Sequence, residues 1–144
     1  MYHYQMLRNI DGRSGTCYME LLPGPFKGNC WNAESIFFDE DADGFGIVET
    51  IIASRASAYD HYDNIEIDSH TCWDIVRDLE TLIGILASDA SPSELRRLPI
   101  IQRHKNFFAE VENNRPALLA MLAELVAWLR VTLDSYRSIT ILGM

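Results

Sequence analysis

Two short runs of the sequence carry oxygen and nitrogen ligands at spacings that metal chemistry uses. The first is Asp39-x-Asp41-x-Asp43-Gly44, which matches the beginning of a calcium-binding EF-hand loop. In such a loop alternate oxygens point at the ion, and the glycine permits a sharp turn. The twelfth position should be a bidentate glutamate but is Thr50, and the flanks favour strands. We therefore expect a solvated acidic hairpin turn, with calcium binding as the alternative.

The second run is Glu66-Ile67-Asp68-Ser69-His70, with a candidate ligand at every second position. On an extended strand these three side chains point to the same side. Carboxylates beside an imidazole suit a metal site in a hydrolase or nuclease. No HExxH motif supports such a site, so a polar strand leading into a helix cap is the simpler interpretation. A metal-dependent hydrolase using Glu66, Asp68 and His70 is kept as an alternative function.

The sequence contains no complete catalytic or cofactor-binding motif. Arg13-Ser14-Gly15 lacks the pattern of a nucleophile elbow. Cys72 lies close to His70 in sequence, but their side chains diverge at the start of a helix. No phosphate-binding loop, dinucleotide fingerprint or zinc-type spacing is present. We expect a protein that is not an enzyme, with no catalytic residue, bound metal or cofactor.

Length, net charge and cysteine content limit the number of domains, the kinds of partner and the cellular compartment that we expect. The 144 residues fit one domain, 1–144, and the net charge of −9 argues against nucleic acid and anionic membranes as partners. The first residues do not form a secretory signal, and three cysteines without a CxxC spacing indicate free thiols in a reducing compartment. The apolar run Ala117–Leu133 contains Glu124 and Arg130, which favours a buried helix over a membrane span. We expect a cytoplasmic protein.

The first half of the chain favours strands and the second half favours helices. Strands are expected over 2–9, 16–22, 34–39 and 45–54, the last two as a hairpin, with a helix over 47–57 as the alternative. Helices are expected over 70–88, 91–98, 103–112 and 117–138, the last entered through Asn113 and Pro116, and a final strand over 138–142. Trp31, Trp73 and Trp128 are expected in the core.

These elements predict an α+β fold, with a small antiparallel sheet from the N-terminal half packed against C-terminal helices. The domain would be β-rich over 1–67 and helical over 68–138.

Charge is unevenly distributed along the chain. Thirteen acidic residues between Glu34 and Glu80 face only Arg55 and Arg77, a net charge of −11. A smaller basic segment spans 95–115. Acidic side chains interleaved with aromatic ones are typical of a face that binds a basic protein. The candidate binding residues are Asp39, Asp41, Asp43, Tyr59, Asp60, His61, Tyr62, Asp63, Glu66 and Asp68.

Residues 35–85 also resemble a known group of proteins. The residues that carry the resemblance are Phe45-Gly46-Ile47-Val48-Glu49, Ile51-Ile52, Tyr59-Asp60-His61-Tyr62, Ile65 and Trp73-Asp74-Ile75. Their spacing is similar to that in bacterial immunity proteins of contact-dependent growth inhibition and related polymorphic toxin systems. The resemblance implies a small, acidic, cytoplasmic protein that binds a cognate toxin domain and blocks its active site.

Together these features predict an immunity protein, monomeric when free, that neutralises the C-terminal domain of a toxin, a basic nuclease. Carboxylates would steer and pair with toxin lysines and arginines, and the tyrosines would supply buried contact area. The alternatives are the metal-dependent hydrolase and a structural adaptor whose apolar helix at 117–133 packs against another chain.

Overall fold

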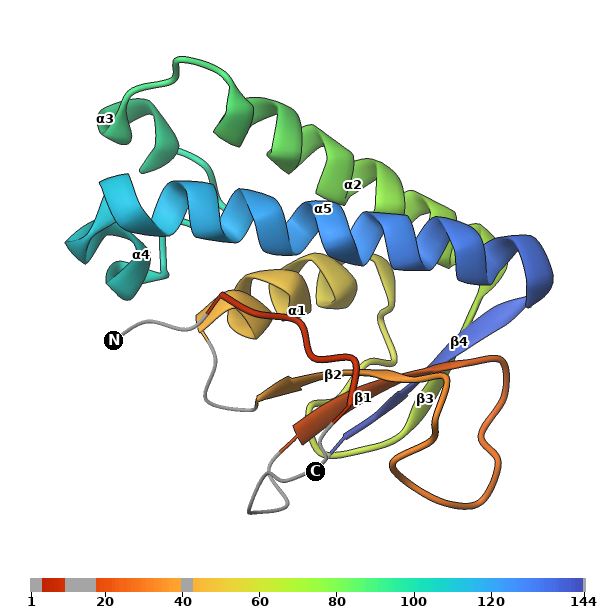
Figure 1. The fold of residues 1–144 in the computed structure, drawn as a ribbon. Helices are drawn as coiled ribbons and strands as arrows, with labels where there is room; N and C mark the ends of the chain where they lie inside the picture. The colour runs from red at the N-terminus through yellow and green to blue at the C-terminus, as the bar shows by residue number, and fades with distance from the viewer. Residues whose placement is uncertain (1–3, 10–17, 40–42, 144) are drawn as a thin grey trace.

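The computed structural model describes residues 4–9, 18–39 and 43–143 (Figure 1). The fold is α+β, as predicted, with a four-stranded antiparallel sheet packed against helices. The elements in chain order are β1 (Tyr18–Pro23), β2 (Ile36–Asp39), α1 (Asp43–Arg55), β3 (Ile65–Asp68), α2 (Ser69–Ala87), α3 (Pro92–Leu95), α4 (Lys105–Ala109), α5 (Val111–Ser135) and β4 (Ser138–Leu142).

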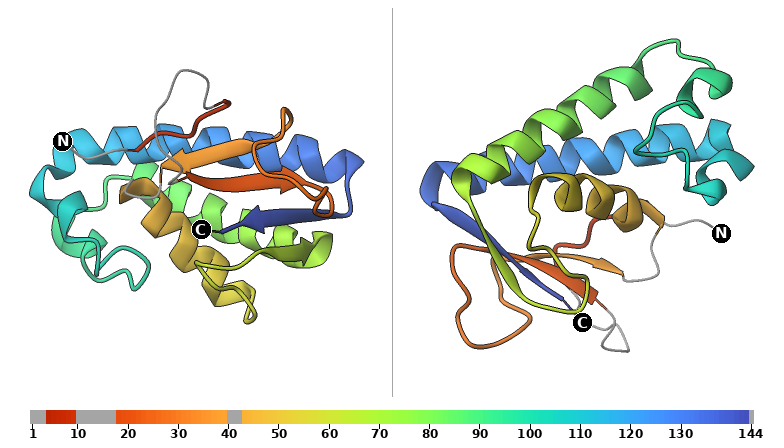
Figure 2. Two further views of the ribbon diagram at one scale, coloured as in Figure 1. Left: turned by 90° about the horizontal axis from the view of Figure 1, so that it is seen from below. Right: turned by 180° about the vertical axis from the view of Figure 1, so that it is seen from behind.

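The strands lie in the order β2-β1-β4-β3, so the last strand of the chain fills a central position. The left panel of Figure 2 shows the four strands side by side with the helices behind them. Tyr18 pairs with Asp39, and Ile65 pairs with Ile141. This register places the end of β2, the end of β4 and the beginning of β3 at one end of the sheet.

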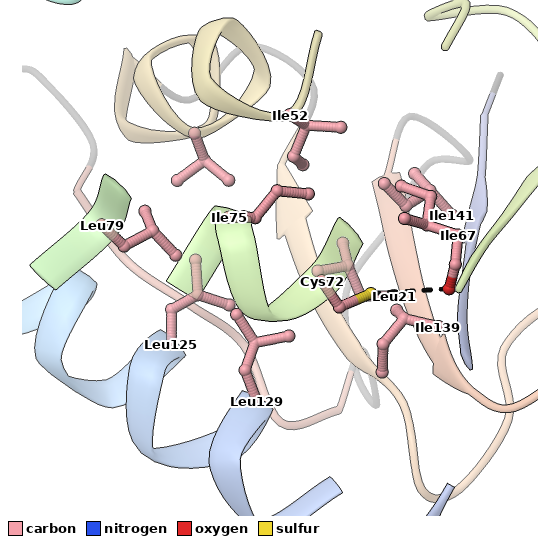
Figure 3. Close-up of a pocket in the computed structure, with 11 residues that line it drawn as sticks. Leu21, Ile52, Ile67, Cys72, Ile75, Leu79, Leu125, Leu129, Ile139 and Ile141 are labelled. Carbon is pink, nitrogen blue, oxygen red and sulfur yellow. Dashed lines mark hydrogen bonds between the residues drawn. The ribbon is translucent and has the colours of Figure 1, made fainter. Parts of the chain in front are cut away.

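The main core lies between one face of the sheet and the helices α1, α2 and α5. Side chains from all four strands and these three helices form this core, and those of β1, β3, β4 and the three helices surround a small apolar cavity of about 20 Å³ (Figure 3). Cys72 lines this cavity, and its Sγ lies 3.5 Å from the carbonyl oxygen of Ile67. Burial raises the pKa of the Cys72 thiol to about 12, and the charge of Asp68 adds to the shift. The thiol is therefore a packing group.

The opposite face of the sheet is covered by the loop 24–35 between β1 and β2. Glu20 and Thr140 point to this face, and both are buried. The Thr140 hydroxyl donates to the carbonyl oxygen of Gly24 at 2.7 Å. The Glu20 carboxylate accepts hydrogen bonds from the same loop. Two buried polar side chains thus hold the loop against the sheet.

The predicted hairpin over 34–39 and 45–54 is wrong in its second arm. Residues 36–39 form β2, but 45–54 lie in α1, as the alternative interpretation had it. Gly44, Phe45, Ile47, Val48, Ile51 and Ile52 are all buried. They lie on one side of the helix, but the other side carries the small residues Gly46, Ala53 and Ser54, so the contrast between an apolar and a charged side is weak and the sequence resembles that of a buried strand. The first half of the chain therefore contains a helix.

The pairing of the N-terminal segment also differs from the prediction. Leu7 pairs with Phe37 of β2 through an isolated antiparallel bridge, with both N–H···O distances at 2.8 Å. The segment thus extends the sheet beyond β2 and does not pair with β1. The expected turn at 11–15 and Thr16 lie outside the described residues.

The start of α5 was placed too late. The helix begins at Val111, so Pro116 lies inside it. The side-chain amide of Asn114 donates to the carbonyl oxygens of Asn106 at 3.0 Å and Phe107 at 3.1 Å. The expected asparagine cap of this helix is therefore wrong: Glu110 precedes α5 and makes no side-chain capping hydrogen bond, and Asn114 binds carbonyl oxygens of α4 instead. The other predicted elements are observed as α2, α3, α4 and β4, with boundaries shifted by a few residues.

Candidate functional site

Residues Tyr59 to Asp63 belong to one loop that joins α1 to β3. The Tyr59 hydroxyl donates to Oε2 of Glu49 on α1, and Nδ1 of His61 lies 2.5 Å from the same oxygen. Glu49 is about three-quarters buried. One carboxylate oxygen thus fixes two side chains of the loop and ties the loop to α1.

Tyr59 is directed into the fold. Burial, with a further contribution from the Glu49 carboxylate, raises the pKa of the Tyr59 hydroxyl well above its ordinary value. The hydroxyl therefore stays protonated and continues to donate. Its ring packs against the main core. Tyr59 is thus a support of the loop, and the expectation that it supplies contact area to a partner is not favoured by this geometry.

Tyr62 is the aromatic residue of the loop that faces solvent. Its side chain is 73% exposed. The ring lies edge-on to that of His61, with centroids 4.8 Å apart and planes at 76°. His61 is in turn held by Glu49. Glu49 therefore holds the His61 ring in place, and the His61 ring supports the exposed ring of Tyr62.

The backbone of the loop is fixed by two aspartates and by the end of β4. Asp60 Oδ1 accepts from the N–H of Tyr62 at 2.9 Å, and Asp63 Oδ1 accepts from that of Asn64 at 2.8 Å. The N–H of Gly143 donates to Asn64 Oδ1 at 3.2 Å. A Cβ at position 143 would lie 2.6 Å from the carbonyl oxygens of both His61 and Asp63, so only glycine permits this approach.

Five predicted binding residues form an exposed surface that we call the acidic rim: Asp39, Asp60, Asp63, Glu66 and Asp68. Asp39 ends β2 at the same end of the sheet as the loop. Three strand spacings, about 14 Å, separate β2 from β3. Glu66 and Asp68 lie on β3, an edge strand. The register places Asp39, Asp60 and Asp63 at one end of the sheet and Asp68, which lies opposite Ser138, at the other end, so the acidic rim is an extended surface and not one compact cluster.

Two carboxylates of the rim also have structural partners. Asp68 caps α2 by accepting from the N–H of Thr71 at 2.8 Å, and this hydrogen bond lowers the pKa of its carboxyl group. Glu66 accepts from the Ser138 hydroxyl at 2.6 Å. Both side chains are exposed, so each fixed carboxylate still faces solvent.

The other acidic residues of the segment 34–80 that the structure describes are engaged elsewhere. Asp74 pairs with Arg77, Asp78 with Arg55, Glu80 with Arg130 and Glu34 with Lys27. Asp43 is half-buried and accepts from the side-chain amide of Asn106 at 2.8 Å. Within residues 4–9, 18–39 and 43–143, no lysine or arginine forms an ion pair with the acidic rim.

The EF-hand alternative is contradicted by the structure. α1 begins at Asp43, so the twelve-residue loop from 39 to 50 does not form, and the Thr50 hydroxyl donates to the carbonyl oxygen of Gly46 inside the helix. Asp41, a predicted binding residue, lies outside the described residues.

The metal site proposed for Glu66, Asp68 and His70 is not supported by the described structure either. The His70 side chain is 88% exposed and lies 4.0 Å from Asp74, while Glu66 and Asp68 have the partners given above. In the described part of the chain, no three His, Cys, Asp or Glu side chains are grouped to hold a metal.

The apolar helix α5 could in principle cross a membrane or, as in the adaptor alternative, pack against another chain. It is the one described helix that is long and apolar enough to cross a membrane, and half of its most apolar window is buried. It packs along α2, as in the core of a soluble protein. Val131 is its one large hydrophobic residue with a mostly exposed side chain, at 71%. This leaves little apolar area for another chain.

Sequence reasoning missed several residues that shape these surfaces. Glu49 was not expected to hold other side chains, although its position between Val48 and Ile51 signals a half-buried carboxylate. Trp31 was expected in the core but is 51% exposed, whereas Trp128 is buried and Trp73 is half-buried beneath Arg130. The role of Gly143 had no signal in the sequence.

Comparison with protein-family models, curated proteins and solved structures finds no match to this chain.

Proposed function

We propose that this protein is a cytoplasmic immunity protein that neutralises a basic toxin domain, a nuclease, by binding it through the acidic rim and Tyr62. The observation that carries the proposal is the set of five exposed carboxylates without a basic partner in the described chain, beside a tyrosine that is 73% exposed. The resemblance of residues 35–85 to immunity proteins supports the same function.

The arrangement suits fast and selective binding of a basic protein. Carboxylates raise the association rate with a basic partner and penalise acidic partners. A nuclease cleft binds phosphates through lysine and arginine, so spaced carboxylates on the rim are complementary to it. Tyr62 would be the buried contact at the centre, because tyrosine adds large area at a low entropy cost.

The supports beneath the rim reduce the cost of binding. Asp60 and Asp63 are fixed by backbone hydrogen bonds, and Tyr62 by its contact with His61. A surface that is ordered before it meets its partner loses less conformational entropy in the complex. β3 has only four residues, and its outward carboxylates discourage strand addition, so binding would use side chains.

The test compares two variants with equal charge. D39N/D60N/D63N removes three charges from the rim, and asparagine retains the oxygen acceptors that the turns need. D89N/E124Q/D134N removes three charges from exposed residues outside the rim. Each is co-expressed with the toxin domain encoded beside the gene, and growth, co-purification and association rate against salt are measured.

The rim variant should lose protection, associate about 10-fold more slowly at low salt and depend less on salt, and the matched control should behave like the wild type. Tyr62→Ala should raise the dissociation rate and leave the association rate unchanged. Equal effects of the two triple variants would place the interface elsewhere. A neighbouring domain that is harmless or does not bind would overturn the function itself.

A further inference from the structure

A cleft of about 390 Å³ lies between α3 and α4, near the beginning of α5. Its lining residues are Arg96, Gln102, Lys105, Phe108 and Ala109. The volume is within the range of sites that bind small molecules. Two cations, one amide and one aromatic ring thus surround it, and no carboxylate is among its lining residues. It is distinct from the acidic rim and has no part in the function proposed above.

The aromatic part of this cleft is anchored to the core. Phe108 meets Phe107 edge-on, with centroids 5.0 Å apart and planes at 90°, and Phe107 is fully buried. The guanidinium carbon of Arg96 lies 5.0 Å from the centroid of the Phe108 ring. This cation–π contact restricts the long arginine side chain and leaves its planar fork able to bind an anion.

The basic charges around the cleft are not neutralised within the described chain. Arg96, Arg97, Arg103 and Lys105 are exposed, and no carboxylate of that part of the protein forms an ion pair with them. Glu94 is occupied in a capping box with Ser91.

Arg115 differs from the other bases of the segment 95–115. It donates to the carbonyl oxygens of Leu86, Ser88 and Ala90 at 2.7–2.8 Å and so closes the end of α2. Four of the five bases are therefore available to a ligand, in a protein of net charge −9.

We propose that this cleft binds a small organic phosphate of the nucleoside monophosphate class. Arg96 and Lys105 take the phosphate, since a guanidinium fork and an ammonium group are the usual phosphate donors. Gln102 and Ala109 take the nucleoside, whose base stacks on the outer face of the Arg96 guanidinium that lies over the Phe108 ring, because bases stack on arginine planes. The cleft is larger than a phosphate ion requires, which favours an organic phosphate over the inorganic ion.

The test is calorimetric titration of the full chain at low salt with AMP, inorganic phosphate and adenosine. AMP should bind saturably with a Kd of about 1 mM or below. Inorganic phosphate should bind about 10-fold more weakly, and adenosine should give no saturable heat. AMP binding should weaken at high salt.

Two double variants with the same charge change locate the site. R96Q/K105Q removes the two cations that line the cleft, and R97Q/R103Q removes two exposed cations of the same segment that do not line it. R96Q/K105Q should weaken AMP binding at least about 10-fold, and R97Q/R103Q should change it less than about 2-fold. All four side chains are exposed, so both variants should fold, which circular dichroism checks.

Equal losses in both variants would indicate diffuse attraction by the basic segment and overturn the site. Equal affinities for AMP and inorganic phosphate would overturn the nucleotide assignment, and so would an AMP titration that does not saturate. None of these outcomes bears on the acidic rim, so the two proposals are tested separately.

Discussion

The buried carboxylate of Glu20 accepts a hydrogen bond from the backbone N–H of Trp31 at 2.5 Å, and Trp31 has a φ of +63°. Glu20 also accepts from the backbone and side chain of Asn32, both at 3.0 Å, and from the Ser35 hydroxyl at 2.5 Å. A left-handed conformation costs a residue with a side chain about 1–2 kcal/mol. One buried carboxylate thus holds the loop 24–35 in a strained turn that leaves the Trp31 ring half-exposed.

Replacing Glu20 should destabilise the protein strongly. Glu20→Ala leaves the backbone N–H groups of Trp31 and Asn32 and the Ser35 hydroxyl without this acceptor and should lower the free energy of unfolding by about 3 kcal/mol. Urea unfolding measures the change. Glu34→Gln, at an exposed ion pair with Lys27 in the same loop, is the control and should unfold like the wild type. Similar midpoints for Glu20→Ala and the wild type would show that the carboxylate does not hold the loop.

Trp31→Gly should be neutral or stabilising, which is unusual for a tryptophan. Glycine adopts positive φ without strain, and the Trp31 side chain is half in solvent. We expect the free energy of unfolding to rise by up to about 1 kcal/mol. The same substitution at Trp128, which is buried, should cost more than about 3 kcal/mol. A large loss at position 31 in urea unfolding would mean that the ring contributes to packing.

The sequence predicted the helices best where an apolar stripe alternates with exposed residues. In α2, Val76, Leu79 and Leu86 are buried at helical spacing, and the helix was placed within one residue of its observed ends. α1 has small, weakly polar residues such as Gly46 and Ala53 on its outer side, so the contrast between its two sides is weak and the short apolar run also fitted a strand. Strand neighbours were not predictable either, since β1 pairs with β4 across more than one hundred residues.

The candidate site was predicted in its composition but not in its organisation. The sequence showed one acidic segment, and the structure divides it between carboxylates paired with arginines, as in Asp78 with Arg55, and those of the acidic rim. Nothing in the spacing separates Asp78 from Asp63, because the pairing depends on how α1 packs against α2. The exposure of Trp31 was missed for a related reason: its conformation depends on a carboxylate eleven residues away.

Stability should fall at alkaline pH in a way that depends on Tyr59. The pKa of the folded Tyr59 hydroxyl is raised above the unfolded value of about 10, so its stabilising contribution is complete below pH 10. Above that pH the unfolded chain releases a proton that the folded chain retains, and the free energy of unfolding decreases. Tyr59→Phe should reduce the slope between pH 10 and 11 by up to one proton. If Tyr59→Phe leaves the slope of the unfolding free energy against pH unchanged, the raised pKa of Tyr59 is contradicted. Tyr62→Phe, which removes the hydroxyl of an exposed tyrosine, is the control.

The two described cysteines should differ sharply in reactivity. Cys30 is exposed, and Cys72 is buried with a pKa of about 12. Because the thiolate is the reactive form, iodoacetamide at pH 8 should modify Cys30 in the folded protein and reach Cys72 only after unfolding. Peptide mass spectrometry distinguishes the sites. Comparable labelling of Cys72 without denaturant would show that the core around the 20 Å³ cavity opens readily.

Two glycines should respond to alanine in opposite directions. Gly143→Ala places a Cβ against the carbonyl oxygens of His61 and Asp63, so it should displace the loop and cost about 1–3 kcal/mol. It should also weaken binding through the acidic rim. Gly84 lies inside α2 with no atom near its Cβ position, so Gly84→Ala should stabilise by about 0.5–1 kcal/mol. Thermal unfolding of both variants is sufficient, and a stabilised Gly143→Ala would refute the close approach.

Because β4 is a central strand, the sheet cannot be completed during synthesis until β4 has been made. Until residues 138–143 are in place, β1 and β3 have no common neighbour, and both present open backbone edges. Pairing across such a separation is slow because the chain must first close a long loop. The loop that carries Tyr62 also has no backing before Gly143 arrives. We therefore expect a ribosome-bound chain that lacks this segment to have neither the completed sheet nor the supported Tyr62 loop.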